Sequence, residues 1–285
     1  MKTRVSIAAL VILDICLFLW AFAPKRYLIV NFLDVGQGDC AVIRTPSGKV
    51  ILIDAGPKTR SKDAGMRVVL PFLRSKGINR IDAILITHPD EDHFGGALSL
   101  IEKEPVGELW LSGISTQNQD YAQLLQNAST KSIKVRELHE GDRLDFHDGV
   151  SSEILNPSED LRVSHNNGSI VMLLKYGATS FMLTGDEEKG AEEHTIQDFA
   201  NLKADVIKVA HHGSKSSSTE ELLSAVTPAV GIISVGAHNV YGHPHPDVLK
   251  RLENHHIKAL RTDQFGEIEA TSNGFEIAFH TALRR

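Results

Sequence analysis

Four side chains of metal-binding type lie close together in the first third of the chain. They are His88, Asp90, Asp92 and His93, which offer imidazole nitrogen and carboxylate oxygen within one short run. Pro89 restricts His88 to an extended backbone, and Gly95-Gly96 allow the chain to turn closely into a helix. A loop of this kind can direct several ligands at one point. The spacing therefore predicts a metal site.

Similar polar groups follow other apolar runs. Asp54, Asp186 and His211 each come directly after a run rich in Val, Ile or Leu, as does His88. Strand ends on a rigid core can hold side chains in a fixed, partly open cluster. The alternative is a solvated surface turn, the usual fate of a charged loop. The repetition of the pattern favours metal ligation.

The elements that position these groups are short strands and amphipathic helices. Helical patterns cover residues 187–199 and 246–253, and Met66, Val69, Leu70 and Leu73 lie at helical spacing before Gly77. Strands are predicted at residues 27–34, 41–45, 50–54, 83–86, 170–174, 181–183, 206–210 and 232–235. Since no linker divides residues 27–285, we expect one domain with two sheets flanked by helices.

The run T-H-x-D-x-D-H-x-G-G at residues 87–96 resembles the metal motif of the metallo-β-lactamase fold. Four further segments resemble the C-terminal hydrolase domain of ComEC-type competence proteins: FLDVGQGD at 32–39, LTGD at 183–186, AHHGS at 210–214 and YGHP at 241–244. The resemblance runs from about residue 27 to 271. It implies a four-layer αββα sandwich with a dinuclear metal site at the edge of the two sheets.

The resemblance also implies a ligand set. His88 and Asp90 would hold one metal, Asp92 and His93 the other, Asp186 would bridge them, and His211 would complete the second site. Zinc is expected first, with manganese as the alternative, because Asp90 replaces a more usual His and adds an oxygen ligand. The family's third motif is represented here only by residues 166–169, with His165 adjacent.

Other residues are expected to act around the metals. Asp92, Asp186 and His243 are the candidate catalytic residues, with His243 as proton donor to a leaving group or, alternatively, a satisfied loop histidine. Asp54 and Asp39 are expected behind the ligands as supporting carboxylates, although Asp39 could equally serve only to end a turn. The candidate substrate-binding residues are Asn167, Ser169, His212, Ser214 and Lys215. Lys208 and Lys215 could contact an anionic substrate or lie on the surface.

The expected reaction is hydrolysis of a phosphodiester by a hydroxide that bridges the two metals. The net charge of −6 gives no general cationic field, so a nucleic acid or other anionic substrate would be attracted by the metals or by a local patch. The alternatives are hydrolysis of a lactam, lactone or thioester, a di-iron redox protein, and a scaffold with a degenerate site.

The N-terminal residues 1–26 have the pattern of a membrane or export segment. Lys2 and Arg4 precede an apolar run at residues 5–23 that is interrupted by Ser6 and Asp14. Its length fits a signal anchor, with a cleaved signal peptide as the alternative. Either predicts a catalytic domain outside the cytoplasm, attached to the membrane or secreted. The two cysteines, Cys16 and Cys40, exclude a disulfide framework.

Overall fold

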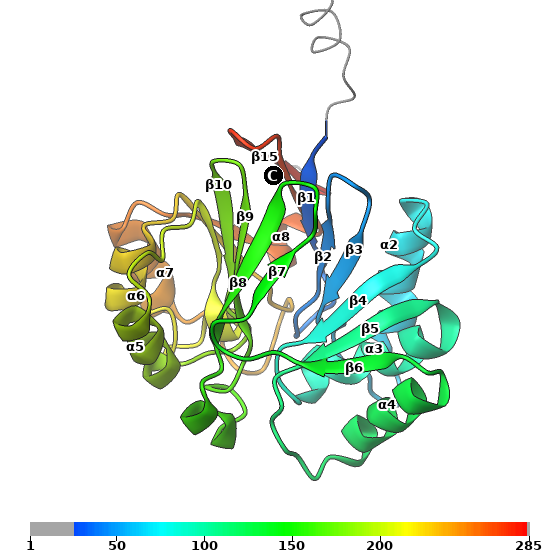
Figure 1. Ribbon diagram of the computed structural model, residues 1–285. Helices are drawn as coiled ribbons and strands as arrows, with labels where there is room; N and C mark the ends of the chain where they lie inside the picture. Colours follow the sequence, from blue (N-terminus) through cyan, green and yellow to red (C-terminus); the bar gives the residue numbers. More distant parts are fainter. Residues whose placement is uncertain (1–25, 284–285) are drawn as a thin grey trace, which may run out of the picture.

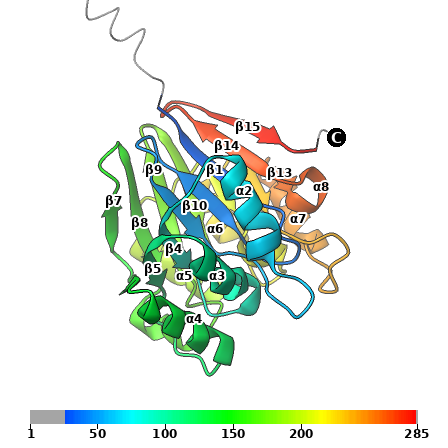
Figure 2. The ribbon, with the colours of Figure 1, turned by 90° about the vertical axis from the view of Figure 1, so that its right-hand side faces the viewer.

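The computed structural model describes residues 26–283 as two β-sheets packed face to face with helices on both outer faces (Figure 1). Helices α2, α3 and α4 cover the first sheet, and the turned view shows them in front of it (Figure 2). Helices α5, α6 and α7 cover the second sheet (Figure 1). The mixed α/β arrangement with two sheets fits the predicted sandwich.

The first sheet has eight strands in the order β15-β14-β1-β2-β3-β4-β5-β6. Strands β14, β1, β2 and β3 pair antiparallel with one another, and β3 to β6 pair parallel. Their bounds are β1 Leu28–Phe32, β2 Ala41–Arg44, β3 Val50–Ile53, β4 Ile81–Ile86, β5 Val106–Leu111, β6 Lys134–Glu137, β14 Ile268–Ser272 and β15 Ile277–Thr281.

The second sheet has seven strands in the order β13-β12-β11-β10-β9-β8-β7. Strands β7 to β10 are antiparallel, whereas β10 to β13 are parallel. Their bounds are β7 Arg143–Asp145, β8 Val150–Asn156, β9 Val171–Tyr176, β10 Thr179–Leu183, β11 Val206–Lys208, β12 Val230–Ile233 and β13 Lys258–Arg261.

The helices are mostly crossover connections between parallel strands. The α-helices are α2 Leu70–Ser75, α3 Glu91–Lys103, α4 Gln119–Thr130, α5 Lys189–Asp198, α6 Glu220–Val226, α7 Pro246–Asn254 and α8 Thr262–Phe265. The π-helix η1 spans Gly65–Val69, and the 3-10 helices η2 and η3 span Glu159–Val163 and Ala210–Gly213.

The core forms three apolar layers. Phe32, Phe181 and neighbouring residues fill the space between the sheets. Phe94 and Leu100 of α3 pack with the outer face of the first sheet, and Leu222 of α6 packs with the outer face of the second. Because both faces of the central strands are covered, β3 is buried at every position.

One edge of the sandwich collects the polar strand ends. Strands β3 and β4 run parallel, so Asp54 after β3 and Thr87 after β4 emerge side by side. Strands β10 and β11 are also parallel and bring Asp186 near residues 210–213. The parallel pairing of distant strands thus assembles groups that are far apart in sequence.

The predicted membrane or signal segment at residues 1–26 lies almost wholly outside the described residues. Among the helices of residues 26–283, none combines the length and apolar character needed to cross a bilayer.

Candidate metal centre

The loop after β4 supplies most of the candidate ligands. Thr87 and His88 follow the strand directly, Asp90 is the N-cap residue of α3, and Asp92 and His93 lie in its first turn. His88 and His93 are almost completely buried. The motif therefore directs two imidazoles inward from a strand end and a helix start, as its spacing predicts.

Buried ligand atoms converge on a first group. The ligand atoms of His88, His93 and Asp186 lie within 4.8 Å of one another. The Nε2 atoms of both histidines and the Oδ1 atom of Asp186 are buried and have no hydrogen-bond partner within residues 26–283. Because unpaired buried polar atoms are costly, a shared partner is needed, and imidazole with carboxylate is a donor set that divalent metals accept. The residues present fit a metal ion.

A second group adjoins the first. Asp92, His93 and His212 also bring their ligand atoms within 4.8 Å of one another. His212 Nε2 lies 3.2 Å from Asp92 Oδ2 and 3.5 Å from Asp186 Oδ2. Asp186 Oδ2 is also 3.3 Å from His93 Nε2. Asp186 therefore faces both groups, which is the position that a bridging carboxylate requires.

The structure departs from the sequence prediction at the histidine pair after β11. The His212 side chain is 3% exposed and joins the second group, whereas the His211 side chain is 24% exposed and joins no such group among the described residues. His211 Nε2 is 3.9 Å from Asp186, and its Nδ1 faces Glu188 at 3.3 Å. The geometry favours His212 over His211 as a metal ligand, whereas the sequence predicts His211 as the ligand and His212 as a substrate contact.

Backbone conformation explains this exchange. His211 and His212 both have left-handed backbone, with φ of 50° and 55°. Two consecutive residues in this region are uncommon for side chains other than glycine, and each costs about 1 kcal/mol or more. The tight turn directs His212 inward and leaves His211 at the rim.

Asp54 supports His93 from behind. Asp54 Oδ2 accepts a hydrogen bond from His93 Nδ1 at 2.8 Å, which leaves Nε2 for a metal. The Asp54 carboxylate also accepts hydrogen bonds from the backbone N–H and the hydroxyl of Thr87. Thr87 was not among the predicted residues, although its place directly before His88 in the motif was a usable signal.

Backbone and buried charges support His212. Its Nδ1 lies 3.0 Å from the carbonyl oxygen of Ser234, so the Nδ1–H tautomer leaves Nε2 for the metal groups. Asp39 Oδ1 is 3.6 Å from the same Nδ1. Lys208 is buried rather than exposed to substrate, and its Nζ pairs with Asp39 and donates to the carbonyl of Gly185 at 3.1 Å.

Electrostatics hold the cluster highly charged in the absence of metal. Burial alone would lower the pKa of His212, but Asp186 and Asp39 raise this pKa to about 10. Burial likewise opposes the charged form of His93, whose pKa the surrounding carboxylates raise well above its usual value. The pKa of Asp186 is held well below its usual range, because the imidazolium groups outweigh the effect of burial. Metal binding must therefore displace protons from the histidines.

Asp90 lies at the mouth of the cluster rather than inside it. Its Oδ2 is 3.5 Å from His88 Nε2, and its Oδ1 is 2.8 Å from His165 Nδ1. Burial would raise the pKa of Asp90, yet His88 and His165 lower it. His165 is adjacent in sequence to the expected third motif. It contacts Asp90, and Asp90 in turn lies near His88 of the first group.

The remaining predicted residues divide into supporting and rim positions. Ser169 is fully buried, and its Oγ accepts the backbone N–H of Asp186, which indicates that it positions Asp186 rather than lining the predicted substrate site. Asn167 Oδ1 accepts backbone N–H groups of Glu188 and Ala191, which also indicates a structural role.

Ser214, Lys215 and His243 lie outside the buried cluster. The Ser214 hydroxyl contacts that of Ser216, and Lys215 pairs with Asp247 at 3.0 Å. The ring of His243 packs edge-on against that of His211, with centroids 5.8 Å apart. Burial and the neighbouring histidines lower the pKa of His243, which opposes the predicted role of proton donor in the metal-free protein.

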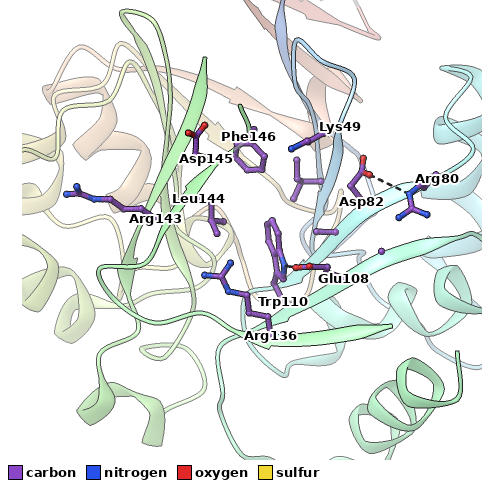
Figure 3. Close-up of a pocket in the computed structure, with 13 residues that line it drawn as sticks. Lys49, Arg80, Asp82, Glu108, Trp110, Arg136, Arg143, Leu144, Asp145 and Phe146 are labelled. Atoms are coloured by element: carbon purple, nitrogen blue, oxygen red, sulfur yellow. Dashed lines mark hydrogen bonds and ion pairs between the residues drawn. The ribbon is translucent and has the colours of Figure 1, made fainter. Parts of the chain in front are cut away.

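A cavity of about 480 Å³ lies elsewhere, between the two sheets beside β7 (Figure 3). Its lining includes Lys49 before β3 and Asp82 near the start of β4, whereas the candidate ligands follow the ends of these strands. Its charges are largely paired, as in Arg80 with Asp82 at 3.5 Å and Arg143 with Glu153 at 2.9 Å. This cavity is therefore not part of the metal centre.

Comparison with known proteins identifies relatives. The profile described as the metallo-β-lactamase superfamily matches residues 33–238. ComE operon protein 3 of Bacillus subtilis is 38% identical over 253 residues, covering 84% of this chain and 32% of that protein. Recombination protein 2 of Haemophilus influenzae is 33% identical over 261 residues, covering 91% and 31%. The chain thus spans about a third of the length of these relatives.

Solved structures share the fold at low identity. CmlA, a diiron β-hydroxylase from Streptomyces venezuelae, has a TM-score of 0.56 and 13% identity, covering 88% of this chain and 54% of that one. A putative metal-dependent hydrolase from Parabacteroides distasonis has a TM-score of 0.50 and 14% identity, covering 82% and 93%. At these identities the likeness concerns the fold alone.

Proposed function

This chain belongs to the metallo-β-lactamase superfamily and is a metal-dependent hydrolase, and we propose that it cleaves phosphodiester bonds with two divalent metal ions. The observation that carries the proposal is the position of Asp186, whose Oδ2 lies within 3.5 Å of Nε2 of both His93 and His212. A pair of metals sharing one carboxylate suits in-line displacement at phosphorus. The relative named Recombination protein 2 supports a substrate of the nucleic-acid type.

We assign the ligands of the two metals as follows. His88 and Asp90 would hold the first metal, Asp92, His93 and His212 would hold the second, and Asp186 would contribute to both. Bound metals lower the pKa of coordinated water and neutralise charge that develops on substrate oxygens. Zinc suits the imidazoles of His88, His93 and His212. Manganese suits the first site, where Asp90 and Asp186 supply carboxylate oxygens.

The residues around the ligands fix their orientation. Asp54 and the Ser234 carbonyl hold the imidazoles of His93 and His212 by their Nδ1 atoms. Ser169 holds the backbone of Asp186. His243 remains the candidate for proton transfer to or from substrate, since its Nδ1 has no hydrogen-bond partner among the described residues.

The test is a substrate screen with defined metals. The purified protein would be stripped with a chelator, and zinc or manganese would be restored before assay with a chromogenic phosphodiester and a chromogenic lactam. We expect metal-dependent turnover of the phosphodiester alone. Turnover of only the lactam would replace the proposal by acyl hydrolysis, and an iron absorption spectrum without hydrolysis would replace it by redox chemistry.

A further inference from the structure

A row of aromatic rings leads from the metal centre to the surface. The His212 ring, inside the second ligand group, has its centroid 6.2 Å from that of His211. The His211 and His243 centroids are 5.8 Å apart, and the His243 and Tyr241 centroids are also 5.8 Å apart. The last two rings are inclined by only 34°. The row ends at Tyr241.

Tyr241 is an exposed aromatic side chain on a braced loop. The residue is 67% exposed, and neighbouring Val240 is 91% exposed. The side chain of Asn239 accepts the backbone N–H groups of Tyr241 and His243 and donates to the carbonyls of Gly236 and His243. A loop held by four hydrogen bonds from one side chain presents Tyr241 at little further entropy cost on binding.

Cations near the centre offer little free charge for a substrate. Lys208 is buried against Asp39, and Lys215 pairs with Asp247. With a net charge of −6, the chain lacks a general field that would attract a polyanion. Contacts that do not depend on charge can therefore add binding energy beyond that of the metals, and the Tyr241 ring supplies one.

We propose that Tyr241 is a stacking site for an unpaired base of a single-stranded nucleic acid, on a nucleotide near the scissile phosphodiester. Aromatic rings stack on any base, so this contact tolerates different sequences but requires the base to be unpaired. The inference rests on the proposed phosphodiesterase function and adds its substrate class.

The test compares two strands that share one backbone. A short labelled phosphorothioate strand with bases, and its counterpart with abasic sugars, would be titrated against the metal-loaded protein by fluorescence anisotropy. Tyr241→Ala should raise the Kd for the strand with bases by roughly five- to hundredfold, as loss of one stacked base predicts. The Kd for the abasic strand should not change. Tyr241→Phe should bind as the parent does, and Val240→Ala serves as the matched exposed control.

Cleavage of ordinary strands provides the second readout. Tyr241→Ala should raise KM for the strand with bases and leave kcat unchanged, because stacking contributes equally before and during the reaction. An unchanged Kd for the strand with bases, or an equal loss for both strands, would overturn the stacking site and leave the proposed function standing. If the parent protein cleaves no phosphodiester, the proposed function fails and the stacking site fails with it.

Discussion

At the residue level, backbone geometry places the adjacent imidazoles of His211 and His212 in different surroundings. The AHHGS segment offered two histidines, and sequence spacing alone could not decide between them. The left-handed backbone at both positions turns His212 toward Asp92 and leaves His211 beside Glu188. Such a conformation is set by the packing around it, so a local pattern does not reveal it.

We expect the two substitutions to differ in metal content. His212→Ala removes one of the ligands proposed for the second metal and should lower the metal bound per chain, because binding weakens when an imidazole ligand is lost. His211→Ala is the matched control and should keep the parent's metal content. Metal analysis after gel filtration measures both. Loss of metal in the His211 variant alone would reverse the assignment.

We expect the buried ion pair between Lys208 and Asp39 to contribute to the stability of the fold. Lys208→Met leaves the Asp39 carboxylate buried without its cation, which should cost about 3–5 kcal/mol of unfolding free energy. The double variant Lys208→Met with Asp39→Asn should recover part of this loss. Urea unfolding at neutral pH measures both values. If the single variant and the parent had equal free energies of unfolding, the ion pair would not stabilise the fold.

Protonation should oppose metal binding. The pKa of His212 is raised to about 10 in the metal-free protein, so at neutral pH this imidazole carries a proton that a metal must displace. Affinity should therefore rise with pH through the range below 10, by up to about tenfold per pH unit for each proton displaced. Titration with zinc in weakly buffered solution should release protons. Affinity independent of pH would contradict this.

At the level of elements, apolar runs predicted the strands that carry the site. The strands before Asp54, His88, Asp186 and the histidine pair all occur near the predicted positions, because each contains a run of buried apolar residues. Helices α5 and α7 also lie within or near the predicted ranges.

Less apolar elements were not predicted. Strands β6 and β7 are short and mostly exposed, so they lack an apolar run. Helix α4 was also missed, although Asn118 caps it and Leu124 and Ala128 lie at helical spacing on its buried face. The polar residues between them weaken that pattern. The supporting role of Lys208 could not be predicted, because its partner is distant in sequence.

Close packing of α3 against the loop after β3 joins two parts of the site. A Cβ at Gly96 would lie 2.1 Å from the carbonyl oxygen of Ala55, the residue after Asp54. Gly96→Ala should push α3 outward, weaken the bond between His93 and Asp54, and destabilise the fold by about 1–3 kcal/mol. Gly190→Ala in α5, where the added atom meets nothing closer than 3.5 Å, is the control. Thermal unfolding and metal content measure the effect, and equal values for both variants would contradict it.

At the level of the whole molecule, two sheets meet at one edge to build the centre. The first sheet contributes His88, Asp92 and His93, and the second contributes Asp186 and His212. Neither sheet alone holds either complete ligand set, so metal binding should depend on the packed sandwich. Asp186 is the residue through which the two proposed sites share one ligand.

Metal content of Asp186→Ala is the most direct test of the account. The parent and the variant would be loaded with zinc, passed through gel filtration and analysed for metal per folded chain, with folding checked by circular dichroism. Asp90→Ala, which removes a ligand of the first site only, is the matched control. We predict two metals in the parent, about one in Asp90→Ala and fewer than one in Asp186→Ala, because a bridging ligand is lost from both sites. Two metals retained by Asp186→Ala would contradict the bridged dinuclear centre.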